Sequence, residues 1–230
     1  MVVFDLDGTL VDSRRDIAES ANELLAACGT PPLEEAAVGG MVGDGAARLV
    51  VRIFEAVRRD PPPDALARFL DIYERRLLVH TRPYDGIVEL LTDLSRRMRL
   101  GVLTNKPLAA TRRILDGLDL TRFFPAELVI GGDGPFPRKP DPAGLLHLAA
   151  SAEAPVGRTL LVGDSLIDWK TAIAAGRTSQ WRLGARPLRR ATPTPIRSRR
   201  SPCQPSSRRA PTTRDPPSGM PQKRPGRARR

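Results

Sequence analysis

Polar side chains that could take part in catalysis follow three segments predicted to be β-strands. The first segment, residues 2–4, is a short β-branched and aromatic run, and the others are residues 100–103 and 159–162. The residues after them are Asp5, Asp7 and Gly8, then Thr104 and Asn105, then Asp164 and Asp168. A further candidate, Lys139, lies in a proline-rich loop. Ligands gather at the carboxyl ends of strands in parallel sheets, so we expect these side chains to converge.

These side chains include the groups that phosphoryl transfer requires. Converging carboxylates repel one another, and a divalent cation removes that conflict; hard oxygen ligands with room for water favour Mg²⁺. One carboxylate can attack phosphorus to form an aspartyl-phosphate, and a second carboxyl two residues later can protonate the leaving oxygen and then activate water. Thr104, backbone amides and Lys139 can stabilise charge on the non-bridging oxygens.

Strands that alternate with helices must position these groups. The predicted helices are 86–97, 108–118, 142–152 and 168–175, and the strands between them are 100–103, 128–130 and 159–162. This alternation predicts an α/β protein with a doubly wound, Rossmann-like parallel sheet. Residues 14–80 show only helical spacing of apolar residues. We therefore predict a core made of residues 1–13 and 81–176, with residues 14–80 inserted after the first strand as an all-helical cap.

Four short motifs resemble those of the haloacid dehalogenase-like hydrolases in order and spacing. They are Asp5-Leu6-Asp7-Gly8-Thr9-Leu10, Thr104, Lys139-Pro140 and Gly163-Asp164-x-x-x-Asp168. Within that superfamily the chain is most similar to phosphoglycolate phosphatases. The features that carry this closer similarity are Asp12-Ser13, the helical cap, residues 42–45 and Thr104-Asn105-Lys106-Pro107. The resemblance covers residues 2–176.

The resemblance implies a role for each motif residue. Asp5 would be the nucleophile and a metal ligand, and Asp7 the general acid/base with its backbone carbonyl on the metal. Asp164 would be a further metal ligand. Asp168 would either bind the metal directly or position the residues that do. The substrate phosphate would be bound by Gly8, Thr104, Asn105 and Lys139. The implied activity is Mg²⁺-dependent hydrolysis of a small phosphomonoester, with 2-phosphoglycolate as the leading substrate.

Two kinds of alternative remain open at this stage. Within the same fold, the chain could be another small-molecule phosphatase, a pyrophosphatase, a nucleotidase or a sugar phosphomutase. In a different class, it could be a catalytically weak protein that binds nucleic acid through its basic C-terminal segment. The intact set of carboxylates argues against the second alternative.

Residues 177–230 differ in composition from the rest of the chain. They hold 16 of the 37 Lys and Arg residues but only one acid, Asp215, and only 10 of their 54 residues are apolar. No apolar strand is evident after Gly176, where the family usually continues its sheet. We expect this segment to be disordered, because it cannot bury enough surface to offset its chain entropy. It either binds nucleic acid non-specifically or, as we favour, is an extension from a shifted reading frame.

Composition also bounds the cellular context. No apolar run approaches the roughly 20 residues that span a bilayer, and the start of the chain reaches an acid by Asp5, unlike a signal peptide. Cys28 and Cys203 lie on opposite sides of the change in composition and suggest neither a disulfide framework nor a zinc site. We expect a cytoplasmic protein whose partner is a small phosphoester; the oligomeric state stays open.

Overall fold

The computed structural model describes residues 1–176 and 180–181. Its centre is a five-stranded sheet in the order β5-β4-β1-β6-β7, with every neighbouring pair parallel. These strands are β1 (Val2–Phe4), β4 (Leu100–Leu103), β5 (Val129–Ile130), β6 (Leu160–Gly163) and β7 (Gln180–Trp181). Because β1 is central and the chain adds strands on both sides of it, the predicted doubly wound α/β core is confirmed.

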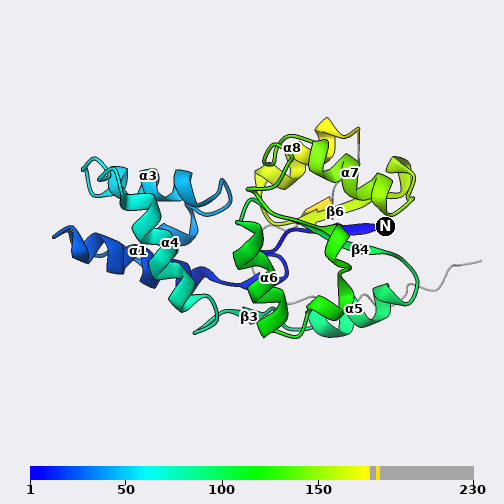
Figure 1. The fold of residues 1–230 in the computed structure, drawn as a ribbon, viewed down its shortest axis with the longest axis horizontal. Coiled ribbons are helices and arrows are strands. Elements are labelled where there is room, and N and C mark those ends of the chain that lie inside the picture. The colour runs from blue at the N-terminus through cyan, green and yellow to red at the C-terminus, as the bar shows by residue number, and fades with distance from the viewer. Residues whose placement is uncertain (177–179, 182–230) are drawn as a thin grey trace, which may run out of the picture. The chain divides into compact units, whose positions relative to one another are not determined.

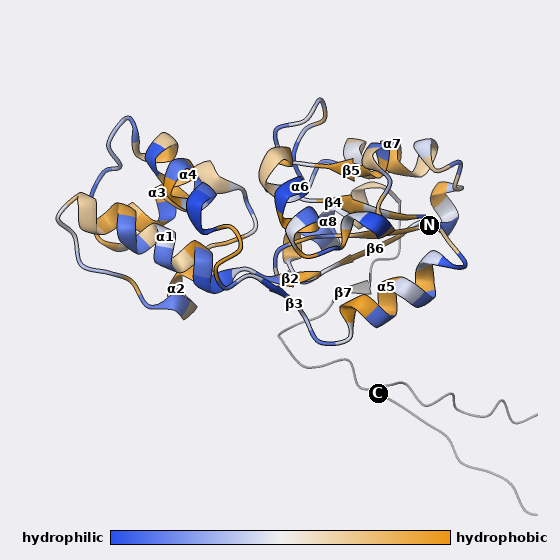
Figure 2. Cartoon of the chain, turned by 60° about the horizontal axis from the view of Figure 1, so that its bottom comes forward, coloured by the Kyte–Doolittle hydropathy of each residue, from blue (hydrophilic) through white to orange (hydrophobic). Residues whose placement is uncertain are grey.

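Helices cover both faces of this sheet (Figure 1). They are α5 (Ile87–Ser95), α6 (Leu108–Gly117), α7 (Ala143–Ser151) and α8 (Leu166–Ala174), with short 3₁₀ helices at Thr121–Phe123, Ala126–Leu128 and Val156–Arg158. Side chains alternate along β1: Val2 and Phe4 join the apolar cluster that includes α5 and α6, whereas Val3 joins the cluster that includes α7 and α8. The strands are accordingly among the most hydrophobic segments of the fold (Figure 2).

Residues 14–80 form helices and no strand, as their sequence pattern predicts. They are α1 (Arg14–Ala27), α2 (Glu35–Gly39), α3 (Ala46–Ala56) and α4 (Ala65–Arg76), coloured blue to cyan in Figure 1. The apolar stripes of the longer helices face one another and bury Leu24, Ile53 and Phe69. Helix α2 was not expected from the sequence, since five residues are too few to show helical periodicity. We keep the name cap for residues 14–80.

The two chain segments that join the cap to the core pair with each other. Strand β2 (Val11–Asp12) lies antiparallel to β3 (Arg82–Pro83), so the chain leaves and re-enters the core along one short ribbon. This pairing could not be predicted from the sequence, because two-residue strands carry no alternating pattern.

The expectation that no strand follows Gly176 is wrong. Gln180–Trp181 forms β7, which is parallel to β6 and pairs Val162 with Gln180. A strand this short has no recognisable apolar period, so the backbone pairing could not be read from composition. The remaining predictions about residues 177–230, including disorder and nucleic-acid binding, concern positions outside the described residues. Within the described part of the chain, no helix has the length and apolar character needed to cross a membrane.

Candidate active site

The carboxyl ends of three neighbouring strands bring the predicted motif residues to one edge of the sheet. Phe4 of β1 is in register with Val102 of β4 and with Val162 of β6. The residues that follow these positions therefore emerge side by side: Asp5 and Asp7 from β1, Thr104 and Asn105 from β4, and Asp164 from β6. This convergence is what the sequence pattern predicts for a parallel sheet.

Asp5 is buried at the end of the central strand. Its Oδ1 accepts a hydrogen bond from the backbone N–H of Leu6 at 2.8 Å and lies 2.8 Å from the Lys139 Nζ. Burial, with repulsion from Asp168 and Asp7, raises the pKa of Asp5 to about 7, although Lys139 opposes the shift. The carboxyl group is therefore held in a fixed orientation in a site with little solvent.

Lys139 supplies a buried positive charge to this edge. Its Nζ lies between two carboxylates, 2.8 Å from Asp5 and 2.6 Å from Asp168. Burial lowers the pKa of Lys139, but the two carboxylates outweigh it, and the net shift is upward. The lysine thus stays protonated and can neutralise part of the charge that a phosphate group would bring.

Asp168 acts at the start of α8 as well as on Lys139. Its Oδ1 accepts a hydrogen bond from Lys139, and its Oδ2 accepts from both the N–H and the hydroxyl of Ser165, at 3.1 and 2.5 Å. Ser165 and Asp168 form a capping box that fixes the first turn of the helix. Both oxygens of Asp168 are therefore already engaged by protein donors, and the residue orients Lys139.

Gly8 allows the loop after β1 to approach Asp164. Its φ is +80°, and a Cβ atom at this position would clash with the carboxylate of Asp164, so a side chain here would be strained and would displace Asp164. Thr9 donates a hydrogen bond to Asp164 Oδ1 at 3.3 Å. Loss of hydration and repulsion from Asp168 raise the pKa of Asp164. A carboxylate of this kind is more stable with a cation beside it.

The three acids at this edge fit a divalent cation. One carboxylate oxygen from each of Asp5, Asp164 and Asp168 lies within 4.8 Å of the others. All are hard oxygen donors, and the raised pKa values of Asp5 and Asp164 reflect an excess of negative charge that Lys139 only partly offsets. The donor set is therefore of the type that Mg²⁺ uses in proteins.

Asp7 is held by two partners on different segments. Its Oδ1 accepts a 2.5 Å hydrogen bond from the Ser13 hydroxyl, and its Oδ2 lies 3.0 Å from the Nζ of Lys106. Lys106 is itself buried and donates a 2.7 Å hydrogen bond to the hydroxyl of Tyr73 on α4. Lys106 belongs to the Thr104-Asn105-Lys106-Pro107 motif, but its role could not be predicted from the sequence, because a lysine after a strand is not by itself a signal of burial.

The segment after β4 connects the motif residues to one another. Thr104 is buried, and its hydroxyl accepts a hydrogen bond from the N–H of Lys106. The Asn105 side chain exchanges two hydrogen bonds with the backbone of Lys139, at 2.9 and 3.0 Å, and donates a third to the carbonyl of Gly43 in the cap. Its side-chain amide is thus engaged with the backbone and positions Lys139 and the cap loop; the predicted contact of Asn105 with substrate stays a prediction.

Asp5 and Asp7 lie between a wide space and a narrow one. The wide hollow, of about 490 Å³, is bordered by Asp5, Asp7 and Asp164, and also by Arg14 and Tyr84. The narrow cavity, of about 50 Å³, lies on the cap side. Its apolar lining consists of Ile17, Val42, Ala46, Leu49, Phe69 and Leu70, and its polar lining includes Tyr73, Thr104, Asn105 and Lys106. Sites for drug-sized ligands have roughly 300–1,000 Å³, so the cap side admits only a small group.

Comparisons with known proteins agree with this geometry. The model of the family described as haloacid dehalogenase-like hydrolase matches residues 2–181. The chain is 45% identical over 184 residues to a phosphoglycolate phosphatase of Rhodospirillum rubrum, covering 76% of each chain. It is 41% identical over 182 residues to a phosphoglycolate phosphatase of Cereibacter sphaeroides, covering 76% of this chain and 81% of that protein.

Solved structures give the same result. The crystal structure of a predicted phosphoglycolate phosphatase from Haemophilus somnus superimposes with a TM-score of 0.73 at 30% identity, covering 78% of this chain and 83% of that one. The structure of CbbY from Rhodobacter sphaeroides in complex with phosphate shares the fold, with a TM-score of 0.67 at 22% identity and coverage of 80% and 86%. From its motifs, its sheet and these relatives, the chain belongs to the haloacid dehalogenase-like hydrolases.

Proposed function

We propose that this chain is a phosphomonoesterase that converts 2-phosphoglycolate to glycolate and phosphate with the help of Mg²⁺. The observation that carries the proposal is the contact of a buried carboxylate, Asp5, with the Lys139 ammonium at 2.8 Å, next to the oxygens of Asp164. A nucleophile, a buried cation and a set of hard oxygen ligands thus meet at one edge of the sheet. The similarity to phosphoglycolate phosphatases supports the choice of substrate.

The reaction would proceed in two displacements on phosphorus. The Asp5 carboxylate attacks the phosphorus atom, the bond to the ester oxygen breaks, and Asp7 gives that oxygen a proton. An aspartyl-phosphate on Asp5 is then hydrolysed by a water molecule from which Asp7 takes a proton, and phosphate is released. Ser13 and Lys106 keep the Asp7 carboxyl in place for both steps. Thr104, which borders the narrow cavity, and Lys139, which contacts Asp5, would bind the non-bridging oxygens.

The metal would be held by Asp5, Asp164 and the backbone carbonyl of Asp7. Asp168 lies close enough to contribute but is engaged by Lys139 and Ser165. When bound, Mg²⁺ would neutralise charge on the transferring phosphoryl group. We keep the cytoplasmic location and the small-molecule nature of the substrate as predictions of the same proposal.

A phosphatase assay over a panel of esters tests the proposal. The panel contains 2-phosphoglycolate, a hexose phosphate, a nucleoside monophosphate and pyrophosphate, each measured with Mg²⁺ and with EDTA. We expect the highest kcat/KM for 2-phosphoglycolate, and loss of all activity in EDTA. A preference for pyrophosphate or a nucleotide would show that the proposed substrate is wrong, but it would leave the proposed mechanism of phosphoryl transfer in place. Full activity in EDTA would contradict the metal site.

A further inference from the structure

Lys106 is a buried cation whose part in the proposed phosphoryl transfer is limited to holding Asp7 in place. Its side chain is 5% exposed, and burial of an ammonium group is unfavourable unless the charge is compensated. It lies at the wall of the narrow cavity, and among the described residues that line this cavity it is the one lysine or arginine. Lys139, which faces Asp5, does not border that space.

The donors of Lys106 are only partly satisfied. An ammonium group has three N–H donors. One faces Asp7 Oδ2 at 3.0 Å and one is donated to Tyr73 Oη at 2.7 Å, and no third acceptor is found among the described residues. The ammonium also lies 4.4 Å from the centre of the Tyr73 ring. The hydroxyl hydrogen of Tyr73 likewise has no acceptor in the described part of the chain, so two donors remain available at the wall of the cavity.

The position of Lys106 beside Asp7 relates it to one part of the substrate. In the proposed reaction Asp7 protonates the ester oxygen. In 2-phosphoglycolate a single methylene group separates that oxygen from the carboxylate, so the carboxylate lies close to whatever surrounds Asp7. Besides Lys106 itself, Asp5, Asp7, Tyr73, Thr104 and Asn105, the lining of the cavity is apolar or glycine, and an anion that enters beside two carboxylates requires a cationic partner.

We infer that Lys106, with the hydroxyl of Tyr73, binds the carboxylate of the substrate and thereby selects phosphate esters that carry an acid group one carbon from the ester oxygen. This inference rests on the proposed function and names the group that determines its specificity. Tyr73 comes from α4 in the cap and Lys106 from the loop after β4 in the core. The bound carboxylate would therefore contact both parts of the protein at once.

The test compares 2-phosphoglycolate with its amide, 2-phosphoglycolamide, which has nearly the same shape but no charge on that side. Charge-assisted hydrogen bonds are worth about 1.5–3 kcal/mol, so wild-type kcat/KM should favour the acid by roughly 10- to 100-fold. In Lys106→Met this ratio should fall below about 5-fold. The variant should also cleave both esters more slowly by the same factor, because Lys106 holds Asp7. This common factor cancels in the ratio of the two kcat/KM values.

Two further measurements keep the test decisive. Arg14→Met is the matched control, because Arg14 is a cation that borders the wide hollow and not the narrow cavity, and its ratio should stay as in wild type. Glycolate should inhibit the wild type competitively and should inhibit Lys106→Met at least about 10-fold more weakly. If Lys106→Met does not fold, Tyr73→Phe replaces it, and we expect the ratio to fall several-fold because one donor to the carboxylate is lost.

The outcomes separate this inference from the proposed function. If the wild type cleaves neither ester with Mg²⁺ present, the proposed function fails. If the wild type cleaves 2-phosphoglycolate but Lys106→Met loses both esters by the same factor, Lys106 only positions Asp7 and the inference is overturned. An unchanged ratio in Tyr73→Phe, or a collapsed ratio in Arg14→Met, would also overturn it.

Discussion

At the level of single residues, the site consists of buried charged side chains, each of which is stabilised by an oppositely charged neighbour. Lys139 is buried between Asp5 and Asp168, and Lys106 between Asp7 and Tyr73. Removing one member of a buried pair leaves the other uncompensated, which costs more than the pair itself contributes to stability. Substitutions here therefore separate catalytic from structural roles only when the remaining charges keep a partner.

Asp5→Asn satisfies that condition. Lys139 keeps its 2.6 Å contact with Asp168, so we expect the variant to fold, with a far-UV spectrum like that of the wild type. An amide is a poor nucleophile, and turnover of 2-phosphoglycolate should fall by at least about 10⁴-fold. Steady-state kinetics measure the loss, and circular dichroism controls for folding. Hydrolysis at the wild-type rate by the folded variant would remove Asp5 from the mechanism.

The raised pKa of Asp5 also predicts a pH dependence of stability. The pKa of this carboxyl is about 7 in the folded protein, against an ordinary value of 3.8 for aspartate. Between these values the folded state binds the proton more tightly than the unfolded state, so this group's contribution to stability falls as pH rises from about 4 to 7. Thermal melts in EDTA should show this loss, and Asp5→Asn should show a smaller one. Equal pH profiles for the two proteins would contradict the assignment.

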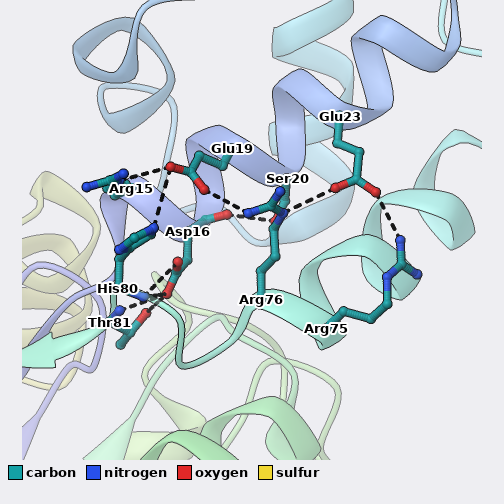
Figure 3. Close-up of polar contacts among 9 residues, drawn as sticks. All are labelled: Arg15, Asp16, Glu19, Ser20, Glu23, Arg75, Arg76, His80 and Thr81. Carbon is teal, nitrogen blue, oxygen red and sulfur yellow. Dashed lines mark hydrogen bonds and ion pairs between the residues drawn. The ribbon is translucent and has the colours of Figure 1, made fainter.

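At the scale of elements, one buried carboxylate joins the cap helix α1 to the chain returning to the core (Figure 3). Asp16 is fully buried, and its oxygens accept hydrogen bonds from the N–H groups of His80 and Thr81 and from the Thr81 hydroxyl, at 2.7–3.0 Å. These contacts lie next to the β2–β3 ribbon that connects cap and core. Asp16 thus ties the start of α1 to the segment that returns to the core.

Asp16→Asn should therefore destabilise the protein. The substitution replaces one carboxylate oxygen, which accepts hydrogen bonds, with an NH₂ group that faces the donors of His80 or Thr81. We expect the free energy of unfolding to fall by roughly 1–3 kcal/mol. Glu23→Gln is the control. Glu23, also on α1, forms exposed ion pairs with Arg75 and Arg76 of α4, and surface ion pairs contribute below about 1 kcal/mol to stability. Urea denaturation measures both. A smaller effect for Asp16→Asn than for Glu23→Gln would contradict this role.

The cap loop that precedes α3 contacts the core through glycine. A Cβ atom on Gly45, whose φ is +89°, would lie 3.0 Å from Arg138 Nη1 and 3.3 Å from the carbonyl oxygen of Asn105. Gly29 also has a positive φ, +67°, but a Cβ there would meet nothing within 4 Å. The two glycines differ in whether a side chain would displace the cap loop from the core.

Gly45→Ala should affect substrate binding more than Gly29→Ala does. Both variants carry the cost of alanine at positive φ, about 1–2 kcal/mol, and both should melt at lower temperature. Only Gly45→Ala moves the loop that lines the narrow cavity, so its KM for 2-phosphoglycolate should rise on the order of 10-fold. Kinetics at a temperature where both variants are folded give the comparison. Similar KM values for the two would show that the loop does not contact substrate.

At the scale of the whole molecule, the sheet depends on its last short strand. β7 covers one side of β6, which carries the Gly163-Asp164 motif at its end. Without β7 the backbone groups along that side of β6 have no partner in the sheet, and exposed edges of this kind promote aggregation. The family match also extends to residue 181, which is where β7 ends.

Two truncations test this dependence. A chain of residues 1–181 keeps β7, so we expect its phosphatase activity to equal that of the full chain. A chain of residues 1–176 lacks β7, and its melting temperature should fall by several degrees, since a change of about 1 kcal/mol shifts a domain of this size by roughly 2–4 °C. Activity and differential scanning calorimetry on the three chains give the answer. Equal melting temperatures for the two truncations would contradict a stabilising role for β7.

The class of fold and the residues of the four motifs could be predicted from the sequence. Apolar periodicity and motif spacing are properties of short windows, so β1 with Asp5 and Asp7, or β6 with Asp164, can be recognised without knowing the rest of the structure. The parallel sheet then requires those strand ends to meet. The helical content of residues 14–80 follows from the same local pattern.

The partners of those residues depend on tertiary packing and could not be predicted from the sequence. Lys106 and Tyr73 are separated by 33 positions, and Asn105 and Lys139 by 34, so their hydrogen bonds depend on how two distant elements pack and not on any local pattern. The same holds for β2, β3 and β7, whose two residues each carry no period and are defined by backbone pairing alone. The catalytic motifs can be recognised in short stretches of sequence. The burial of Lys106 and the lining of the narrow cavity arise only when the cap packs on the core.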